Sequence, residues 1–468
     1  MSDKARWKGR GQHLRGPDQS RPGRWELKQK SLLLLMAAPL IAWGQIPSTQ
    51  IPAPNSLTIK SPTQEASSKV AAVNSSSPSS DDSDGENARR DLDSCHIHKV
   101  TSFPGSHQFA SDFIEAMASD PDPNAKDPTV VWGLTADFGS KVPLQDWAMY
   151  ISKSTNGGAT WTQVARVDSK YFDAGIGEGL RNGLSVSPGG TDFVITTQRG
   201  AFQVFPQSNT SDALVKSVAG PNVPHLRPRV SIPKSEGDAV RAGVVKITGD
   251  GKHMLVGYGY FDLDPHIFSY HKDDNGSWIE DGPLPQIPTE MDILSMQFDD
   301  SQKLSPSYLY VGTGDQAYRL NLHTMTWTLI AGVGPDSAIH GMSTVGGLHL
   351  AACWGVYIPA NAGAVTWVTN ARFLLHRAKD QAGPNLRAYS IEVDPSKPNR
   401  IVVTAITGVY ISRDSGKTWK RINDLPEEEF RSAHFNSDGT VIVSGIAGTF
   451  LANPFSNACS PHLKTRDK

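Results

Sequence analysis

The chain has 468 residues, enough for two or three average domains or for one large β domain built from repeats. Its 45 basic and 47 acidic residues give a formal net charge of -2, which excludes an overall field that would attract nucleic acid or an anionic membrane. The 42 glycines, 32 prolines and 11 tryptophans favour an all-β protein with many short strands and frequent turns.

Residues 1–44 have the pattern of a secretory signal peptide. A basic N-terminal stretch precedes a short apolar run over residues 31–43, and cleavage is expected near Gly44. The apolar run is too short for a comfortable membrane span. We therefore expect a secreted or periplasmic protein without stable membrane insertion.

Residues 45–94 form a second region of distinct composition. They are rich in Ser, Pro, Thr, Asn and acidic residues and almost lack aromatic side chains. Such a segment cannot bury enough apolar surface to fold alone, so we predict a disordered linker. The folded domain is expected over residues 95–460, with a disordered tail at 461–468.

From about residue 100 onward one unit recurs about every 40 to 50 residues. Each unit reads as an apolar strand, a turn, a second strand and, in most copies, a hairpin that ends in Trp. Units this short cannot bury both of their faces alone, so the repeat predicts a β-propeller with four-stranded antiparallel blades. We expect seven blades, with six as the alternative because the first unit is irregular.

The last unit stops before its outermost strand. Residues 98–103 are expected to supply that strand and so close the ring. This closure would bring Cys95 close to Cys459, and in an exported protein it predicts a disulfide between them, with Cys353 left as a buried free thiol. Three unpaired thiols remain the alternative.

Two hairpins carry nearly the same octapeptide, Ser-x-Asp/Asn-x-Gly-x-Thr-Trp. Its acidic or amide side chain can cap the turn, its Gly can adopt a positive φ and its Trp can bury a ring. The motif residues are Ser154, Asn156, Gly158 and Trp161 in one hairpin, and Ser412, Asp414, Gly416 and Trp419 in the other.

This octapeptide resembles the Asp box, or BNR repeat, of sialidases, xyloglucan-cleaving hydrolases, sortilin-type receptors and photosystem II assembly factors. The resemblance implies a propeller fold. It implies no single activity, because in these families the box is a folding device that usually lies away from the catalytic centre.

The innermost strand of each propeller blade lines the central channel, so the residue before it should lie at the channel mouth. Aligned by that strand, the repeats place four arginines, one histidine and one aspartate there. Guanidinium groups bind carboxylates or sulfates in two-point contact, which predicts an anion site. The residues are Arg181, Arg241, Asp292, His340, Arg387 and Arg431, with Tyr389 beside Arg387 as a further ligand-binding candidate. The alternative is that these arginines pair with acidic residues of the same loops and hold adjacent blades together; those residues are Glu178, Asp238, Glu290 and Glu429.

The sialidase resemblance extends in kind to this rim, because sialidases bind the carboxylate of their sugar with an arginine triad. Hydrolysis would need two carboxylates, or a Tyr with a Glu beside an Asp acid. The catalytic candidates are Glu178, Asp292 and Asp137. Glu178 ranks first because three glycines surround it and Arg181 lies nearby. Loop carboxylates are mostly solvated turn formers, so each assignment is a hypothesis.

The sequence thus predicts an exported propeller that recognises a glycan or other anionic ligand at the channel mouth, with hydrolysis of that glycan an open question. The alternative is a non-catalytic scaffold that docks a protein partner on its top face. A deep mouth with a carboxylate pair would favour the enzyme, and a flat, charge-paired top would favour the scaffold. We expect no cofactor, no nucleic-acid partner and no metal site, since no His or Cys cluster has ligand spacing.

Overall fold

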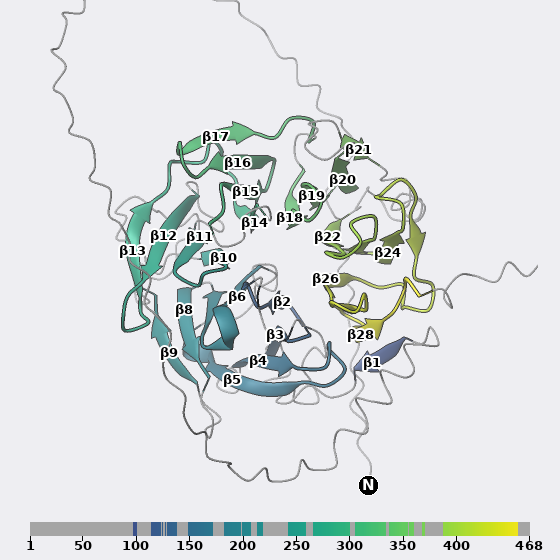
Figure 1. Ribbon diagram of the computed structural model, residues 1–468, viewed down its shortest axis with the longest axis horizontal. Coiled ribbons are helices and arrows are strands. Elements are labelled where there is room, and N and C mark those ends of the chain that lie inside the picture. The colour runs from purple at the N-terminus through teal and green to yellow at the C-terminus, as the bar shows by residue number, and fades with distance from the viewer. Residues whose placement is uncertain are drawn as a thin grey trace, which may run out of the picture. The chain divides into compact units, whose positions relative to one another are not determined.

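The computed structural model contains seven four-stranded antiparallel sheets arranged around one axis, as Figure 1 shows. The described residues are 97–100, 114–137 except 123, 125, 126 and 128, 148–171, 182–218 except 198 and 207–212, 242–258, 265–299, 305–333, 337–359 except 354, 367–369 and 387–456. The predicted signal peptide, linker and tail lie outside them. The seven-bladed, all-β prediction is confirmed.

The first four blades follow the chain order from the axis outward. Blade 1 consists of β2 (Ala116–Ser119), β3 (Val131–Asp137), β4 (Ala148–Ser154) and β5 (Thr162–Asp168). Blade 2 consists of β6 (Leu184–Val186), β7 (Phe193–Thr197), β8 (Gly200–Phe205) and β9 (Leu214–Ser217). Blade 3 consists of β10 (Ala242–Ile247), β11 (His253–Tyr258), β12 (His266–Lys272) and β13 (Trp278–Pro283). Blade 4 consists of β14 (Ile293–Phe298), β15 (Tyr308–Thr313), β16 (Ala317–Asn321) and β17 (Thr326–Leu329).

The remaining three blades complete the circle. Blade 5 consists of β18 (Ile339–Ser343), β19 (His349–Ala352), β20 (Gly355–Pro359) and β21 (Trp367–Thr369). Blade 6 consists of β22 (Ala388–Val393), β23 (Ile401–Ala405), β24 (Gly408–Ser412) and β25 (Lys420–Arg421). Blade 7 consists of β26 (Phe430–Phe435), β27 (Val441–Gly445), β28 (Gly448–Ala452) and β1 (His98–Val100). Short 3-10 helices lie at Ser169–Tyr171 and Pro188–Gly190.

The N-terminal strand β1 closes the ring. It pairs antiparallel with β28, with His98 opposite Leu451 and Val100 opposite Thr449. The predicted closure by residues from the start of the folded domain is therefore confirmed. Cys95 and Cys459, whose pairing was inferred from this closure, lie outside the described residues.

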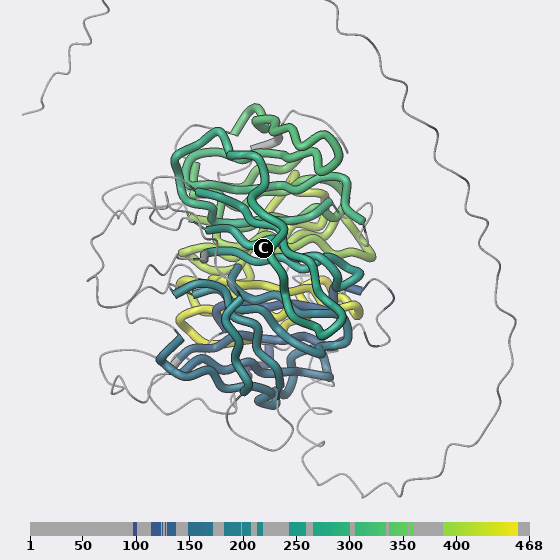
Figure 2. The backbone as a smooth tube through the Cα atoms, turned by 90° about the vertical axis from the view of Figure 1, so that its left-hand side faces the viewer, coloured from purple at the N-terminus to yellow at the C-terminus, as the bar shows by residue number. Residues whose placement is uncertain are grey.

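The second and third strands of most blades are buried on both faces. All five residues of β23 and of β27 are buried, for example, because neighbouring blades pack against either side of the sheet. Figure 2 shows the ring from the side. Apolar clusters accordingly join adjacent blades, such as blades 3 and 4 through Val244, Leu255 and Leu309. This double burial explains why unbroken apolar runs, and not alternation, mark these strands in the sequence.

The two octapeptide hairpins connect the third and fourth strands of blades 1 and 6. In blade 6 Ser412 Oγ accepts the Gly416 amide at 2.8 Å, and Asp414 accepts the Thr418 amide at 2.8 Å and its hydroxyl at 2.6 Å. Burial raises the pKa of Asp414, but hydrogen bonds from Thr418, Ser412 and Lys417 outweigh it, and the net pKa is lowered.

The blade 1 hairpin reproduces this conformation with Asn156. Its Oδ1 accepts the Thr160 amide at 2.9 Å, while its Nδ2 donates to the Thr160 hydroxyl at 2.8 Å. The hairpin packs on blade 7, because Asn436 Nδ2 donates to Gly157 O at 2.8 Å. Gly158, with φ of 91°, has no room for a side chain, since a Cβ there would lie 2.5 Å from Ile442 Cδ1. The hairpin therefore joins one blade to the preceding one.

Candidate functional site

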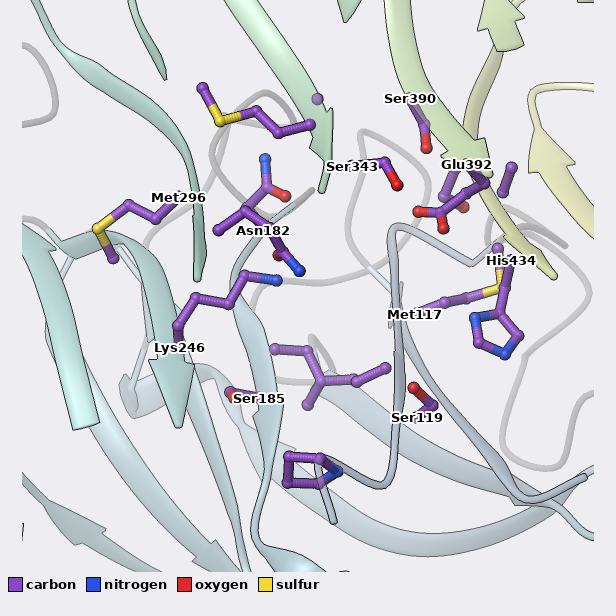
Figure 3. A pocket seen from close by; sticks show the side chains of 18 of the residues that line it. Met117, Ser119, Asn182, Ser185, Lys246, Met296, Ser343, Ser390, Glu392 and His434 are labelled. Atoms are coloured by element: carbon purple, nitrogen blue, oxygen red, sulfur yellow. The ribbon is translucent and has the colours of Figure 1, made fainter. Parts of the chain in front are cut away.

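The axis of the ring holds a cavity of about 350 Å³ lined by the innermost strands of all seven blades (Figure 3). This volume is at the low end of the roughly 300 to 1,000 Å³ typical of small-molecule sites. The cavity extends from residues at the start of the innermost strands, such as His340 and Arg431, to the turns that follow them, such as Asp299 and Pro395.

A β-bulge recurs at the start of the innermost strand in blades 3 to 7. In each case the pairing with the second strand skips one residue. Bulges bend a strand and redirect side chains, and three of the skipped residues, His340, Tyr389 and Arg431, line the cavity. The skipped residues are Gly243, Leu294, His340, Tyr389 and Arg431. We call the end of the channel where these residues lie the bulge end.

The third residue after each bulge also lines the cavity, and together with Ser185 of blade 2 these residues make a polar layer. Its members come from six blades: Ser185, Lys246, Gln297, Ser343, Glu392 and His434. Such a set is unusual in strands that are otherwise apolar. Polar groups converging on one axis from six separate sheets can orient a small polar molecule.

The polar layer contains one ammonium group and one carboxylate. In Figure 3 Lys246 extends into the cavity from one side, and Glu392 lies on the other side with His434 near it. Burial lowers the pKa of His434 to about 4, so its imidazole is neutral at pH 7 and can donate or accept one hydrogen bond. The layer is thus electrically balanced and rich in hydrogen-bonding groups.

Asn182 crosses the bulge end of the channel. Its Nδ2 donates to Leu294 O of blade 4 at 2.8 Å and to His340 O of blade 5 at 3.0 Å, although Asn182 itself belongs to blade 2. These contacts tie three blades together across the axis.

Arg431 is held by two carboxylates at the bulge end. Its Nε lies 2.7 Å from Glu429 Oε1, and its Nη1 lies 3.5 Å from Glu115 Oε2 of blade 1. Burial lowers the pKa of Arg431, but the attraction of Glu115 and Glu429 outweighs this and raises it overall. The alternative expectation, that Arg431 pairs with Glu429 and joins adjacent blades, is confirmed. A ligand contact by Arg431 stays a prediction.

The other described rim residues fall into two sets. His340 and Tyr389 occupy bulges and line the cavity, as Arg431 does, and their ring centroids lie 5.7 Å apart. Asp292 and Arg387 lie two residues before the bulges of their strands and do not line the cavity. The sequence alignment treated Asp292, His340, Arg387 and Arg431 as equivalent. It placed the start of the innermost strand two residues too late in blades 5 and 7, but correctly in blades 4 and 6.

Several predicted residues lie where their side chains are not described. Asp137 ends β3 of blade 1, and only its backbone is described. Glu178, Arg181 and Arg241 lie outside the described residues. The proposed catalytic carboxylates are therefore not brought together by the part of the structure that can be described, and their roles stay predictions.

The polar layer was missed from the sequence, although a signal for it exists. Lys246, Gln297, Glu392 and His434 each interrupt an apolar innermost strand at the same register position. A search for polar residues within the innermost strands would have found the polar layer, whereas the prediction from the sequence considered the residues that precede those strands.

The described residues contain no group of three or more His, Cys, Asp or Glu side chains that could hold a metal ion. Within the same residues, no helix is long and apolar enough to cross a membrane.

No protein-family model matches the sequence, and no curated protein matches it. Among solved structures, YCF48 bound to D1 peptide is 14% identical with a TM-score of 0.47, over 77% of this chain and 96% of that one. The WD40 β-propeller domain of Doa1 is 11% identical with a TM-score of 0.47, over 76% and 96%. The GH74 enzyme of Niastella koreensis is 18% identical with a TM-score of 0.46, over 74% and 52%. At these identities and scores the similarities carry no argument about family or activity.

Proposed function

We propose that this protein binds a small acidic sugar, or a closely similar polyhydroxylated carboxylate, in its axial cavity. The observation that carries the proposal is the polar layer, in which one ammonium group faces hydroxyl, amide, imidazole and carboxylate groups across a space of about 350 Å³. The ligand class is the one expected from the sequence, but the recognising groups are on the inner wall and not on an arginine rim.

The roles within the layer follow from charge and hydrogen-bonding capacity. Lys246 supplies the positive charge for a ligand carboxylate, through a charge-assisted hydrogen bond. Glu392 accepts hydrogen bonds from ligand hydroxyls, and Gln297 and Ser343 can both donate and accept.

The cavity supports binding better than hydrolysis. Besides Glu392, the lining carboxylates are Asp120 and Asp299 at the far ends of their strands. Asp120 already accepts the backbone amides of Asp122 at 3.0 Å and Gly189 at 2.8 Å, which commits both of its oxygens to turns. A glycosidase needs two carboxyl groups placed on either side of one bond, one of them as a proton donor.

Calorimetric titration of the full chain with glucuronate and with methyl glucoside tests the proposal. Charge-assisted hydrogen bonds contribute about 1.5 to 3 kcal/mol, so glucuronate should bind at least about tenfold more tightly. Lys246→Met should abolish that preference and Lys246→Arg should retain part of it. Lys216→Met, on the outer strand β9, is the matched control and should bind as the parent does. No binding of any acidic sugar, or an unchanged preference in Lys246→Met, would overturn the proposal.

Turnover is measured in the same preparation with aryl glycosides of neutral and acidic sugars. We expect binding without release of the aryl group. If the parent protein releases the aryl group and Glu392→Gln does not, the protein is a hydrolase and not only a binding protein. An exported location belongs to the same proposal, and mapping the N-terminus of protein recovered outside the cytoplasm checks it. A mature chain that still begins at Met1 would exclude cleavage near Gly44.

A protein-docking scaffold is the second candidate, and exposed apolar side chains favour it. Met291 and Ile446 are 41% and 57% exposed, and both lie beside the residues that lead into innermost strands. Arg431, in the innermost strand of the blade that carries Ile446, is already paired with Glu115 and Glu429. A photo-crosslinking residue at position 446 should then capture a defined partner, whereas one at Leu329 on outer strand β17 should not. Equal labelling at both positions would remove this candidate.

A further inference from the structure

A thiol and an imidazole meet at the bulge end of the channel, and the proposed sugar site does not use the thiol. His340 Nε2 lies 3.2 Å from Cys353 Sγ, within hydrogen-bonding distance for sulfur. Among the described residues Cys353 is a free thiol, and it is partly exposed where a fully buried side chain was expected. A nucleophile and a base within this distance form the basic unit of nucleophilic cysteine chemistry.

The fold fixes both partners. Cys353 directly follows β19, and its amide donates to Ala338 O at 3.0 Å, which holds it beside the start of β18. His340 occupies the bulge of β18, where its ring packs against Tyr389 and its carbonyl accepts the Asn182 amide at 3.0 Å. Contacts from blades 2, 5 and 6 therefore maintain the geometry, and the thiol is not on a loose loop.

A space for a reactant adjoins the pair. His340 lines the axial cavity, and Cys353, although not itself a lining residue, contacts the ring of a residue that is. Cys353 is partly exposed, so a small reagent can approach this residue. A cavity beside His340, a nucleophile and a general base thus occur together, and this combination distinguishes the pair from an isolated cysteine.

We propose that Cys353 and His340 form a reactive thiol site that is oxidised by small hydroperoxides. In the reaction His340 Nε2 takes the thiol proton. The sulfur then attacks the O–H oxygen of the hydroperoxide as the O–O bond breaks. The sulfur becomes a sulfenic acid, losing two electrons that reduce the peroxide. The leaving hydroxide or alkoxide recovers the proton from His340 and departs as water or an alcohol.

The test measures how fast hydrogen peroxide converts Cys353 into a dimedone adduct in the full-length protein at pH 7, read by peptide mass spectrometry. Peptide mapping separates Cys353 from Cys95 and Cys459. General-base assistance contributes about a hundredfold or more in enzymes, so His340→Gln should slow the reaction by at least about tenfold. His323→Gln makes the same change at an exposed position between β16 and β17 and should react at the parent rate. Equal rates in the parent and His340→Gln would overturn the proposal.

A second measurement is independent of how well His340→Gln folds. An unassisted thiol loses about tenfold in rate for each pH unit below its ionisation range. In the parent protein the proposed pair predicts a much shallower fall between pH 7.5 and 5.5, because the proton moves to the imidazole and not to bulk water. A full tenfold fall for each pH unit would exclude the pair as the reactive unit.

Discussion

Replacing Gly158 by Ala tests the hairpin contact that joins blade 1 to blade 7. The backbone at Gly158 has φ of 91°, and an added Cβ would lie 2.5 Å from Ile442 Cδ1 and 2.7 Å from its Cγ1. Left-handed backbone costs an L-residue about 1 to 2 kcal/mol. Forcing a methyl group into a packed interface costs a further 1 to 3 kcal/mol or so. Gly158→Ala should therefore destabilise the protein by about 2 to 5 kcal/mol.

Gly276 provides the matched control for that change. It occupies the corresponding hairpin of blade 3 with φ of 77°, but a Cβ there would meet nothing within 4 Å. Gly276→Ala should then show only the backbone cost of about 1 to 2 kcal/mol. Urea unfolding followed by tryptophan fluorescence measures both variants. If the two changes lower the midpoint equally, steric contact with Ile442 does not hold the blades together and the reasoning fails.

Three further predictions follow from the charged and titratable groups. Because burial lowers the pKa of His434 in the folded protein, the unfolded chain takes up a proton first as pH falls, so the stability of the fold should be complete above about pH 6.5 and should fall as pH drops toward 4. His434→Gln should flatten the pH dependence of the melting temperature, and an unchanged slope would contradict this. Asp414→Asn should cost less stability than Asp414→Ala, since Asn156 fills the same role in blade 1. Asp414→Asn should also reduce the stability that the protein loses as pH falls through the lowered pKa of Asp414. Equal melting temperatures of the two variants would argue against a capping role. Lys272→Met should lower the free energy of unfolding by about 3 to 5 kcal/mol, because the buried carboxylate of Asp192 then loses its cation. Asp192 is 3% exposed and lies 2.6 Å from Lys272 Nζ. Adding Asp192→Asn should recover part of that loss, measured by chemical unfolding.

The blade pattern could be predicted from the sequence because each blade repeats a local signal. Strands buried on both faces appear as unbroken apolar runs, as in residues 401–405 and 441–445, and glycine turns separate them. The ring closure could be predicted because the final unit lacks a strand and residues 98–100 could supply one. These features depend on composition and order along the chain, which a sequence displays directly.

The site was harder to predict because it depends on register at a scale of one or two residues. A shift of two residues in the assumed start of a strand decides whether Asp292 or Leu294 is aligned with the bulge residues His340 and Arg431, and the hydrophobic pattern does not specify that start. The Asn182 contacts to Leu294 and His340 join positions more than one blade apart. The pairing of His340 with Cys353 likewise joins two strands of blade 5 through a side-chain approach that no spacing rule encodes.

The closure of blade 7 also sets an order of events in folding. The strand at His98–Val100 is synthesised before any other strand of the ring, yet its partner Gly448–Ala452 is synthesised last. Until then the early strand has no place in a sheet, and afterwards it covers the outer edge of β28, which would otherwise present open backbone groups to other chains. Strand β1 can therefore complete blade 7 only after β28 has been synthesised.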